Sequence, residues 1–151
     1  MLKNAYVSLG IQTLVGGIIM YLVMFVMIDG LDSFFNNFNM FYMTVMMVAP
    51  MVVLMIIAMG HMFPSKSANI ALTLGAVLAF VASFALIRTQ TTIGDRAFLR
   101  SMIPHHSGAI LMCREASLRD PTLLRLCDDI IRSQRQEIDQ MKRMLASADA
   151  E

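Results

Sequence analysis

The segment MIPHHSGAILMC, residues 102–113, holds the side chains best suited to binding a metal ion. Two imidazoles, two thioethers and a thiol lie within about three turns of a helix; they belong to Met102, His105, His106, Met112 and Cys113. Nitrogen and sulfur ligands suit a soft ion such as Cu(I) or its congener Ag(I), whereas Mg²⁺ and Ca²⁺ require oxygen ligands. The alternative is that the histidines are helix residues whose polar atoms are satisfied by hydrogen bonds alone.

A second segment, QRQEIDQM at residues 134–141, supplies further candidates. At helical spacing, Gln134, Glu137 and Met141 lie on one side of a helix. Met141 adds a third thioether, and Glu137 and Gln134 are auxiliary candidates. Glu137 could instead be a hydrogen-bond partner that fixes the tautomer and orientation of a histidine.

Both segments are expected to lie on a helical hairpin, with helices at residues 95–118 and 121–147. Asp120 followed by Pro121 is typical of a helix start, because the aspartate can accept from first-turn amides and proline fits the first helical position. Apolar steps of three and four predict one buried seam in each helix. The predicted seams are Phe98, Met102, His105, Ala109, Met112 and Ala116 in the first helix, and Leu124, Cys127, Ile131, Gln134, Ile138, Met141 and Leu145 in the second.

Two helices alone cannot surround a core, and about sixty residues are few for an independent fold. We therefore expect a second copy of the chain to complete a four-helix bundle. The protein would then be a homodimer or a higher homo-oligomer.

The two cysteines are level with each other if the turn is centred near residue 120. A disulfide between Cys113 and Cys127 is one possibility in an oxidising compartment. However, Cys113 lies one residue beyond the predicted seam position Met112, about 100° around the helix, so its side chain is expected to point away from Cys127. The sequence therefore favours free thiols, with Cys113 as an auxiliary metal ligand.

The composition indicates a membrane protein of two parts. Hydrophobic residues make up 57% of the chain and charged residues only 15%, against about 25% charged in soluble domains. Residues 1–88 hold three Lys or Arg and two Asp or Glu, whereas residues 89–151 hold nine of each. Uncharged stretches at residues 4–28, 40–63 and 68–87 are each long enough to cross a bilayer. We expect a membrane domain at 1–88, a metal-binding hairpin at 89–151, and no nucleic-acid partner, because no basic surface is present.

The topology follows from the few charges between the predicted spans. Lys3 and Lys66 lie on one side of the membrane, and Asp29 and Asp32 lie on the other. This contrast places the N-terminus in the cytoplasm and the hairpin on the periplasmic or extracytoplasmic side of the inner membrane.

The chain is rich in methionine, with 16 residues, and many of them follow the second predicted span at steps of three or four. One interpretation is packing, because flexible thioether side chains fill gaps between helices. The other is a thioether path for a soft monovalent ion, formed by Met40, Met43, Met47, Met51, Met55 and Met59.

The stretch FLRSMIPHHSGAILMCREA, followed by IIRSQRQEIDQM, resembles the domain of unknown function 305 family over about residues 94–147. The three apolar stretches also resemble the membrane segment before that domain in many members. The resemblance implies a ferritin-like bundle in extracytoplasmic proteins associated with copper and silver binding or tolerance. Its matching positions are Met102, His105, His106, Met112, Gln134, Glu137 and Met141.

Taken together, the sequence predicts an all-α protein that binds Cu(I) or Ag(I) at the membrane, for sequestration, tolerance or transfer to a copper-handling protein. The alternative is a metal-free oligomerisation or assembly module of a membrane complex. We do not expect an enzyme, since a di-iron site needs about four carboxylates and Glu-x-x-His motifs. Glu115 and Glu137 lack a histidine at that spacing.

Overall fold

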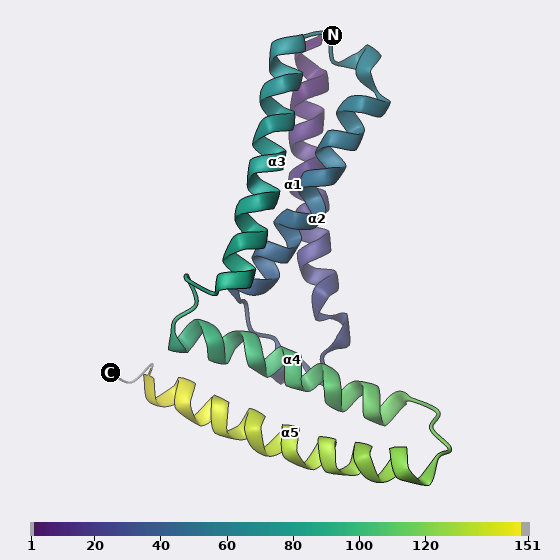
Figure 1. The fold of residues 1–151 in the computed structure, drawn as a ribbon, viewed down its shortest axis with the longest axis vertical. Helices are drawn as coiled ribbons and strands as arrows, with labels where there is room; N and C mark the ends of the chain where they lie inside the picture. Colours follow the sequence, from purple (N-terminus) through teal and green to yellow (C-terminus); the bar gives the residue numbers. More distant parts are fainter. Residues whose placement is uncertain (1, 149–151) are drawn as a thin grey trace. The chain divides into compact units, whose positions relative to one another are not determined.

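The computed structural model describes residues 2–148, and these residues form helices and no strand (Figure 1). Five α-helices and three short 3₁₀ helices follow one another along the chain. Their order is α1 (Leu2–Val23), η1 (Met24–Met27), η2 (Leu31–Ser33), α2 (Phe38–Ala58), η3 (Gly60–Met62), α3 (Lys66–Thr89), α4 (Asp95–Glu115) and α5 (Pro121–Ala148). The expected all-α class is confirmed.

Three of these segments are long and apolar enough to cross a membrane: residues 5–27, 38–58 and 66–89. They coincide with the three uncharged stretches of the sequence to within a few residues. The hairpin helices also lie where the sequence predicts them, except that α4 ends at Glu115 rather than at residue 118, because Ala116 takes an extended conformation.

The chain divides into two compact units. The membrane unit comprises residues 1–23 and 39–92, and the hairpin unit comprises residues 24–38 and 93–151. The segment between the first two spans therefore belongs to the same unit as the C-terminal hairpin. If all three candidate spans cross the membrane, that segment and the hairpin lie on the same side of it, in agreement with their packing in one unit.

Within the membrane unit, polar contacts join the start of α1 to the start of α3. The Tyr6 hydroxyl donates to Oδ1 of Asn69 at 2.9 Å and accepts from the amide of Ser65 at 3.2 Å. The Asn69 side chain in turn donates to the carbonyl of Phe63 at 2.8 Å. Ser65 also caps α3 by accepting from the amide of Ala68. These bonds satisfy backbone polar groups in the connection between α2 and α3 and at the start of α3.

The hairpin core lies between α4 and α5, which run side by side (Figure 1). Its buried residues are Leu99, Ile103, Ile110, Ile138, Met141 and Leu145. The α5 half of this core matches the predicted seam except at Leu124, which lies near the turn and is 46% exposed. The α4 half does not: Phe98, His105 and Met112 are exposed, and the buried positions are about one residue away.

This correction has a physical cause in the segment that covers the hairpin. Phe35 packs against the hairpin core, and the backbone of η1 lies against α4, where the Met27 carbonyl comes within 3.4 Å of a Cβ built on Gly108. Ser107, fully buried, accepts a hydrogen bond from the amide of Asp29 at 2.7 Å. Residues 24–38 thus cover part of the apolar surface of the hairpin, which we expected a second copy of the chain to cover. Dimerisation itself stays a prediction.

Two ion pairs attach the covering segment to the hairpin. Asp29 pairs with Arg114 on α4, and Asp32 pairs with Lys142 on α5. The hydrogen bond from Lys142 holds the pKa of the Asp32 carboxyl below its ordinary value. In the sequence analysis these aspartates indicated only the orientation of the predicted spans. Their spacing does not identify a partner on α4 or α5.

Asp120 begins α5 as predicted. Its Oδ1 accepts from the amides of Thr122 at 2.7 Å and Leu123 at 3.1 Å. The amides of Leu123 and Thr122 hold the pKa of Asp120 below its ordinary value. The stabilisation of the hairpin by the ionised Asp120 cap is therefore fully present above the unfolded-state pKa of about 3.9. It is lost as the pH falls through the lower pKa of Asp120 in the folded protein.

We expect the Asp120→Ala variant to lower the midpoint of thermal unfolding of the hairpin, because two first-turn amides lose their acceptor. Asp128→Ala, exposed about two turns into α5, is the matched control and should change it little. Circular dichroism melts at pH 7 and pH 3 measure both. The difference between the two variants should shrink at pH 3, and a difference that grew in acid would contradict the capping role.

Candidate metal site

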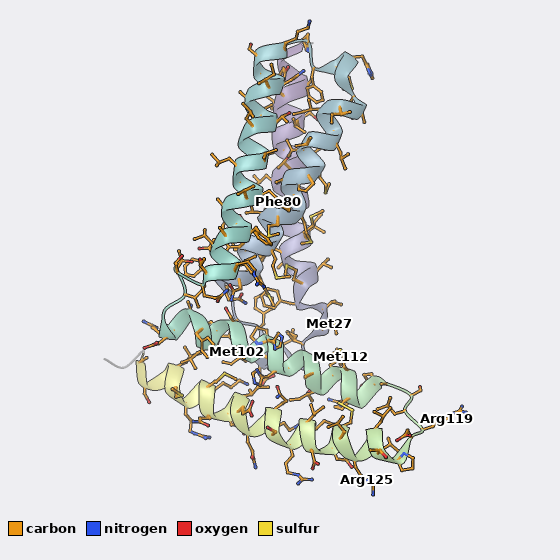
Figure 2. All side chains as sticks on the ribbon, in the orientation of Figure 1. Met27, Phe80, Met102, Met112, Arg119 and Arg125 are labelled. Atoms are coloured by element: carbon orange, nitrogen blue, oxygen red, sulfur yellow. A yellow bond between two sulfur atoms is a disulfide. The ribbon has the colours of Figure 1, made fainter. Side chains whose placement is uncertain are left out.

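The candidate ligands on α4 point in two different directions. His106 and Met102 are half-buried on the side of α4 that faces α5, whereas His105 and Met112 are exposed. Met102 and Met112 lie at separate places along the helix (Figure 2), about 15 Å apart in helical rise. The structure therefore does not bring the predicted α4 ligands into a single cluster.

His106 has both ring nitrogens engaged. Nδ1 lies 2.9 Å from the carbonyl oxygen of Met102, one helical turn earlier. Because that carbonyl can only accept, Nδ1 carries a proton, and Nε2 is the nitrogen able to bind a metal ion. Nε2 points across to α5 and lies 2.7 Å from Oε2 of Glu137. The imidazole is only 12% exposed, so this nitrogen is held inside the seam.

Glu137 is positioned by its own helix. Its Oε1 accepts from Oγ of Ser133, one turn earlier, at 2.8 Å. A carboxylate can only accept, so in this arrangement a proton lies between Oε2 and Nε2 of His106. A metal ion bound at Nε2 must replace that proton. Ser133 was missed by sequence reasoning, although a serine four residues before a glutamate on a helix is a recognisable signal.

The two helices contribute matching pairs to this part of the seam. Met102 and His106 are four residues apart on α4, and Glu137 and Met141 are four residues apart on α5. Met141 is buried, and Met102 packs against the core cluster that contains it. Gln134 is half-buried one turn before Glu137. The structure thus places one imidazole and one carboxylate in contact, with one thioether a helical turn away on each helix.

Cys113 and Cys127 form a disulfide, with their Cα atoms 5.2 Å apart. The prediction of free thiols is wrong, and so is the auxiliary ligand role of Cys113, because neither sulfur is a thiolate. The cause is the same shift of register that buries Ile103 instead of Met102: Cys113 lies on the side of α4 that faces α5. The sequence did indicate that the two cysteines are level with each other along the hairpin. With both side chains facing the opposite helix, this position allows the disulfide to form.

Among residues 2–148, no three or more His, Cys, Asp or Glu side chains are grouped as a metal site. The seam offers one imidazole and one carboxylate in contact. The further candidate donors nearby are the thioethers of Met102 and Met141 and the carboxamide of Gln134. Such a ligand set fits Cu(I) or Ag(I) and does not fit hard divalent ions.

Residues 82–145 match the family described as Domain of unknown function (DUF305). The chain is also similar to the protein called "Uncharacterized protein L153" of Acanthamoeba polyphaga mimivirus, with 39% identity over 103 residues. That alignment covers 66% of this chain and 65% of the relative, so it spans just under two thirds of the relative's length. No solved structure matches the chain.

Proposed function

We propose that the protein is a membrane-anchored binder of Cu(I) or Ag(I), with the ion held in the α4–α5 seam by Met102, Met141 and Nε2 of His106. The observation that carries the proposal is Nε2 of the half-buried His106, which faces the opposite helix, one turn from a thioether on its own helix. The Met102 carbonyl fixes the tautomer that presents this nitrogen.

The proposed site predicts proton release when the ion binds. Glu137 is the charged group that faces His106 Nε2, and the ion must displace the proton between them. Thioether sulfur needs no deprotonation. The affinity should therefore fall as the pH is lowered.

We also propose that the hairpin lies outside the cytoplasm, on the periplasmic or extracytoplasmic side of the inner membrane. The acidic segment 24–38 is on the same side as the hairpin, and the Cys113–Cys127 disulfide suits an oxidising compartment. A bound ion would then be sequestered or passed to a copper-handling partner on that side.

The test is a competition titration of the detergent-purified full chain with a chromophoric Cu(I) chelator. His106→Ala should weaken binding at the hairpin by about 100-fold or more, because the loss of an outer-shell partner alone typically costs about 10–100-fold. His105→Ala, one residue away and exposed, is the matched control and should bind almost as tightly as the unaltered protein. Equal affinities for all three proteins would reject the assignment.

A metal-free assembly module is the second candidate function. It is favoured by the exposed strip of Phe98, His105 and Met112, which repeats every seven residues on α4. A second copy of the chain is the expected occupant of this strip, as the sequence predicted. Silent metal titrations, together with a dimer that is lost in Phe98→Glu, would favour this function over metal binding.

A further inference from the structure

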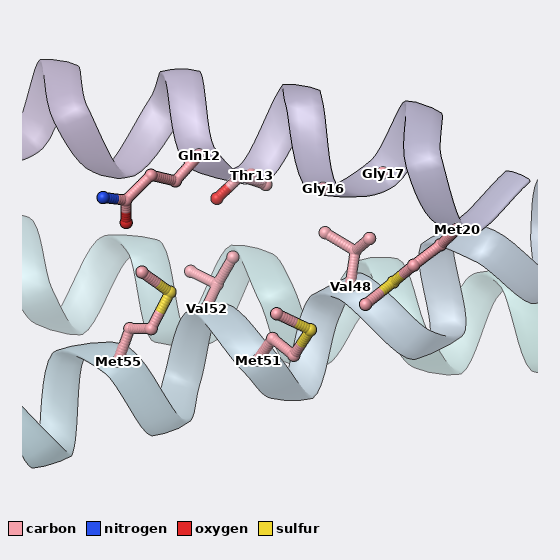
Figure 3. A pocket seen from close by; sticks show the side chains of 9 residues that line it. All are labelled: Gln12, Thr13, Gly16, Gly17, Met20, Val48, Met51, Val52 and Met55. Carbon is pink, nitrogen blue, oxygen red and sulfur yellow. The ribbon is translucent and has the colours of Figure 1, made fainter.

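A cavity of about 170 Å³ lies between α1 and α2 in the membrane unit (Figure 3). Gly16 and Gly17 form part of its wall on α1. A Cβ built on Gly16 would meet nothing within 4 Å, and one on Gly17 would meet only a methyl group of Val48 at 3.6 Å. The cavity therefore exists because this part of α1 carries no side chains.

Three methionines line the cavity. Met51 and Met55 come from α2, one helical turn apart, and Met20 comes from the facing side of α1. Figure 3 shows the side chains of Met55 and Gln12 facing each other across the space. The side-chain N–H of Gln12 donates to Ser8 Oγ at 3.5 Å, which leaves the carboxamide oxygen as an acceptor at the cavity.

The lining combines uncharged polar side chains with thioethers. Uncharged polar side chains in membrane spans usually form hydrogen bonds within the protein. Here Gln12 and Thr13 lie beside three sulfur atoms in a wall that is otherwise valine and glycine. Thioethers bind soft monovalent ions without losing a proton, and no acidic residue in the lining would attract a hard divalent ion.

We propose that this cavity is a second binding site for Cu(I) or Ag(I), with Met20, Met51 and Met55 as its ligands. Of the methionines on α2, Met51 and Met55 line it, whereas Met43, Met47 and Met59 do not. Met51 is also 41% exposed, as exposed as Met47, so it lies at the mouth of the cavity. The site is therefore local and shared between two helices. It lies wholly within the membrane unit and does not depend on the seam site.

The experiment uses the full chain in lipid nanodiscs, with His106→Ala, Met102→Leu and Met141→Leu introduced to remove the proposed seam ligands. Ag(I) is the probe, and its affinity and stoichiometry are measured by competition. In this background, Met20→Leu/Met51→Leu/Met55→Leu should weaken Ag(I) binding by more than about 100-fold, since ligand loss exceeds outer-shell effects. The control Met43→Leu/Met47→Leu/Met59→Leu removes three exposed sulfurs and should retain one equivalent.

A third variant separates the cavity from its sulfurs. Gly16→Leu keeps every methionine and fills the space, so Ag(I) affinity should fall as in the triple variant. A further measurement needs no mutation in the membrane unit: peroxide oxidation of the methionines is mapped by mass spectrometry. Bound Ag(I) should slow the oxidation of Met20, Met51 and Met55 and leave the oxidation of Met43 unchanged. Equal binding by the two triple variants, or uniform oxidation with and without Ag(I), would overturn the proposal while leaving the seam site untouched.

Discussion

Ile103→Ala is expected to lower the free energy of unfolding of the hairpin by about 2–5 kcal/mol, the usual cost of removing a large aliphatic side chain from a core. Ile103, on α4, is 0% exposed and packs in the buried cluster that α4 shares with α5. The surrounding side chains come from two helices fixed by a disulfide, so the cavity cannot collapse easily. Native-state hydrogen exchange of the α4 and α5 amides in the full chain measures the change.

Phe98→Ala is the matched control, because the predicted seam buried Phe98 and the structure leaves it 51% exposed. Its effect on hairpin exchange should stay within about 0.5 kcal/mol. If Phe98→Ala were the more destabilising of the two, the seam predicted from the sequence would be right and the observed register wrong.

Removal of the disulfide should have an effect of similar size. Cys113 and Cys127 are 14 residues apart, and a closed loop of about 15 residues is worth about 3 kcal/mol in the chain-entropy model. The Cys113→Ser/Cys127→Ser variant should therefore exchange its hairpin amides faster, with the largest change near the turn. The same measurement with reductant on the unaltered protein should reproduce this loss.

The control for the disulfide is the reductant itself. It should leave the exchange of the double variant unchanged, because no bond remains to be broken. Intact mass after alkylation should show two more alkyl groups on the reduced protein than on the unreduced one. No gain on reduction would mean that the cysteines are free and would remove the basis for this prediction.

The three helices long and apolar enough to cross a membrane were predictable because their signal is local. A span needs only length and the near absence of charge, and both can be read from consecutive residues. The start of α5 was equally predictable, since Asp120 caps amides two and three residues later. In each case the physical cause lies within one segment of the chain.

The α4 register was not predictable in the same way. Apolar residues surround α4 on more than one side, because it packs against α5 and against residues 24–38. The single seam predicted from that pattern runs through Phe98, His105 and Met112, on the side of α4 that neither neighbour covers. The sequence therefore placed Met112 and His105 inside, and the structure places Ile103 and Ile110 there.

The site was predicted in part for the same reason. His106 and Glu137 were both named, and the sequence offered their contact as one interpretation of Glu137. What it could not supply was the direction of each ring nitrogen, which depends on the Met102 carbonyl and on α5. The separation of His105 from His106 likewise depends on which side of α4 meets α5.

X-ray absorption spectroscopy of the Cu(I)-loaded protein tests the central claim most directly. The sample is the full chain carrying Met20→Leu, Met51→Leu and Met55→Leu, loaded with one equivalent of Cu(I), so that the α4–α5 seam holds the ion. The account predicts a sulfur shell together with one imidazole, and loss of the imidazole signal in His106→Ala but not in His105→Ala. A shell of nitrogen and oxygen alone, or an imidazole signal that survives His106→Ala, would contradict it.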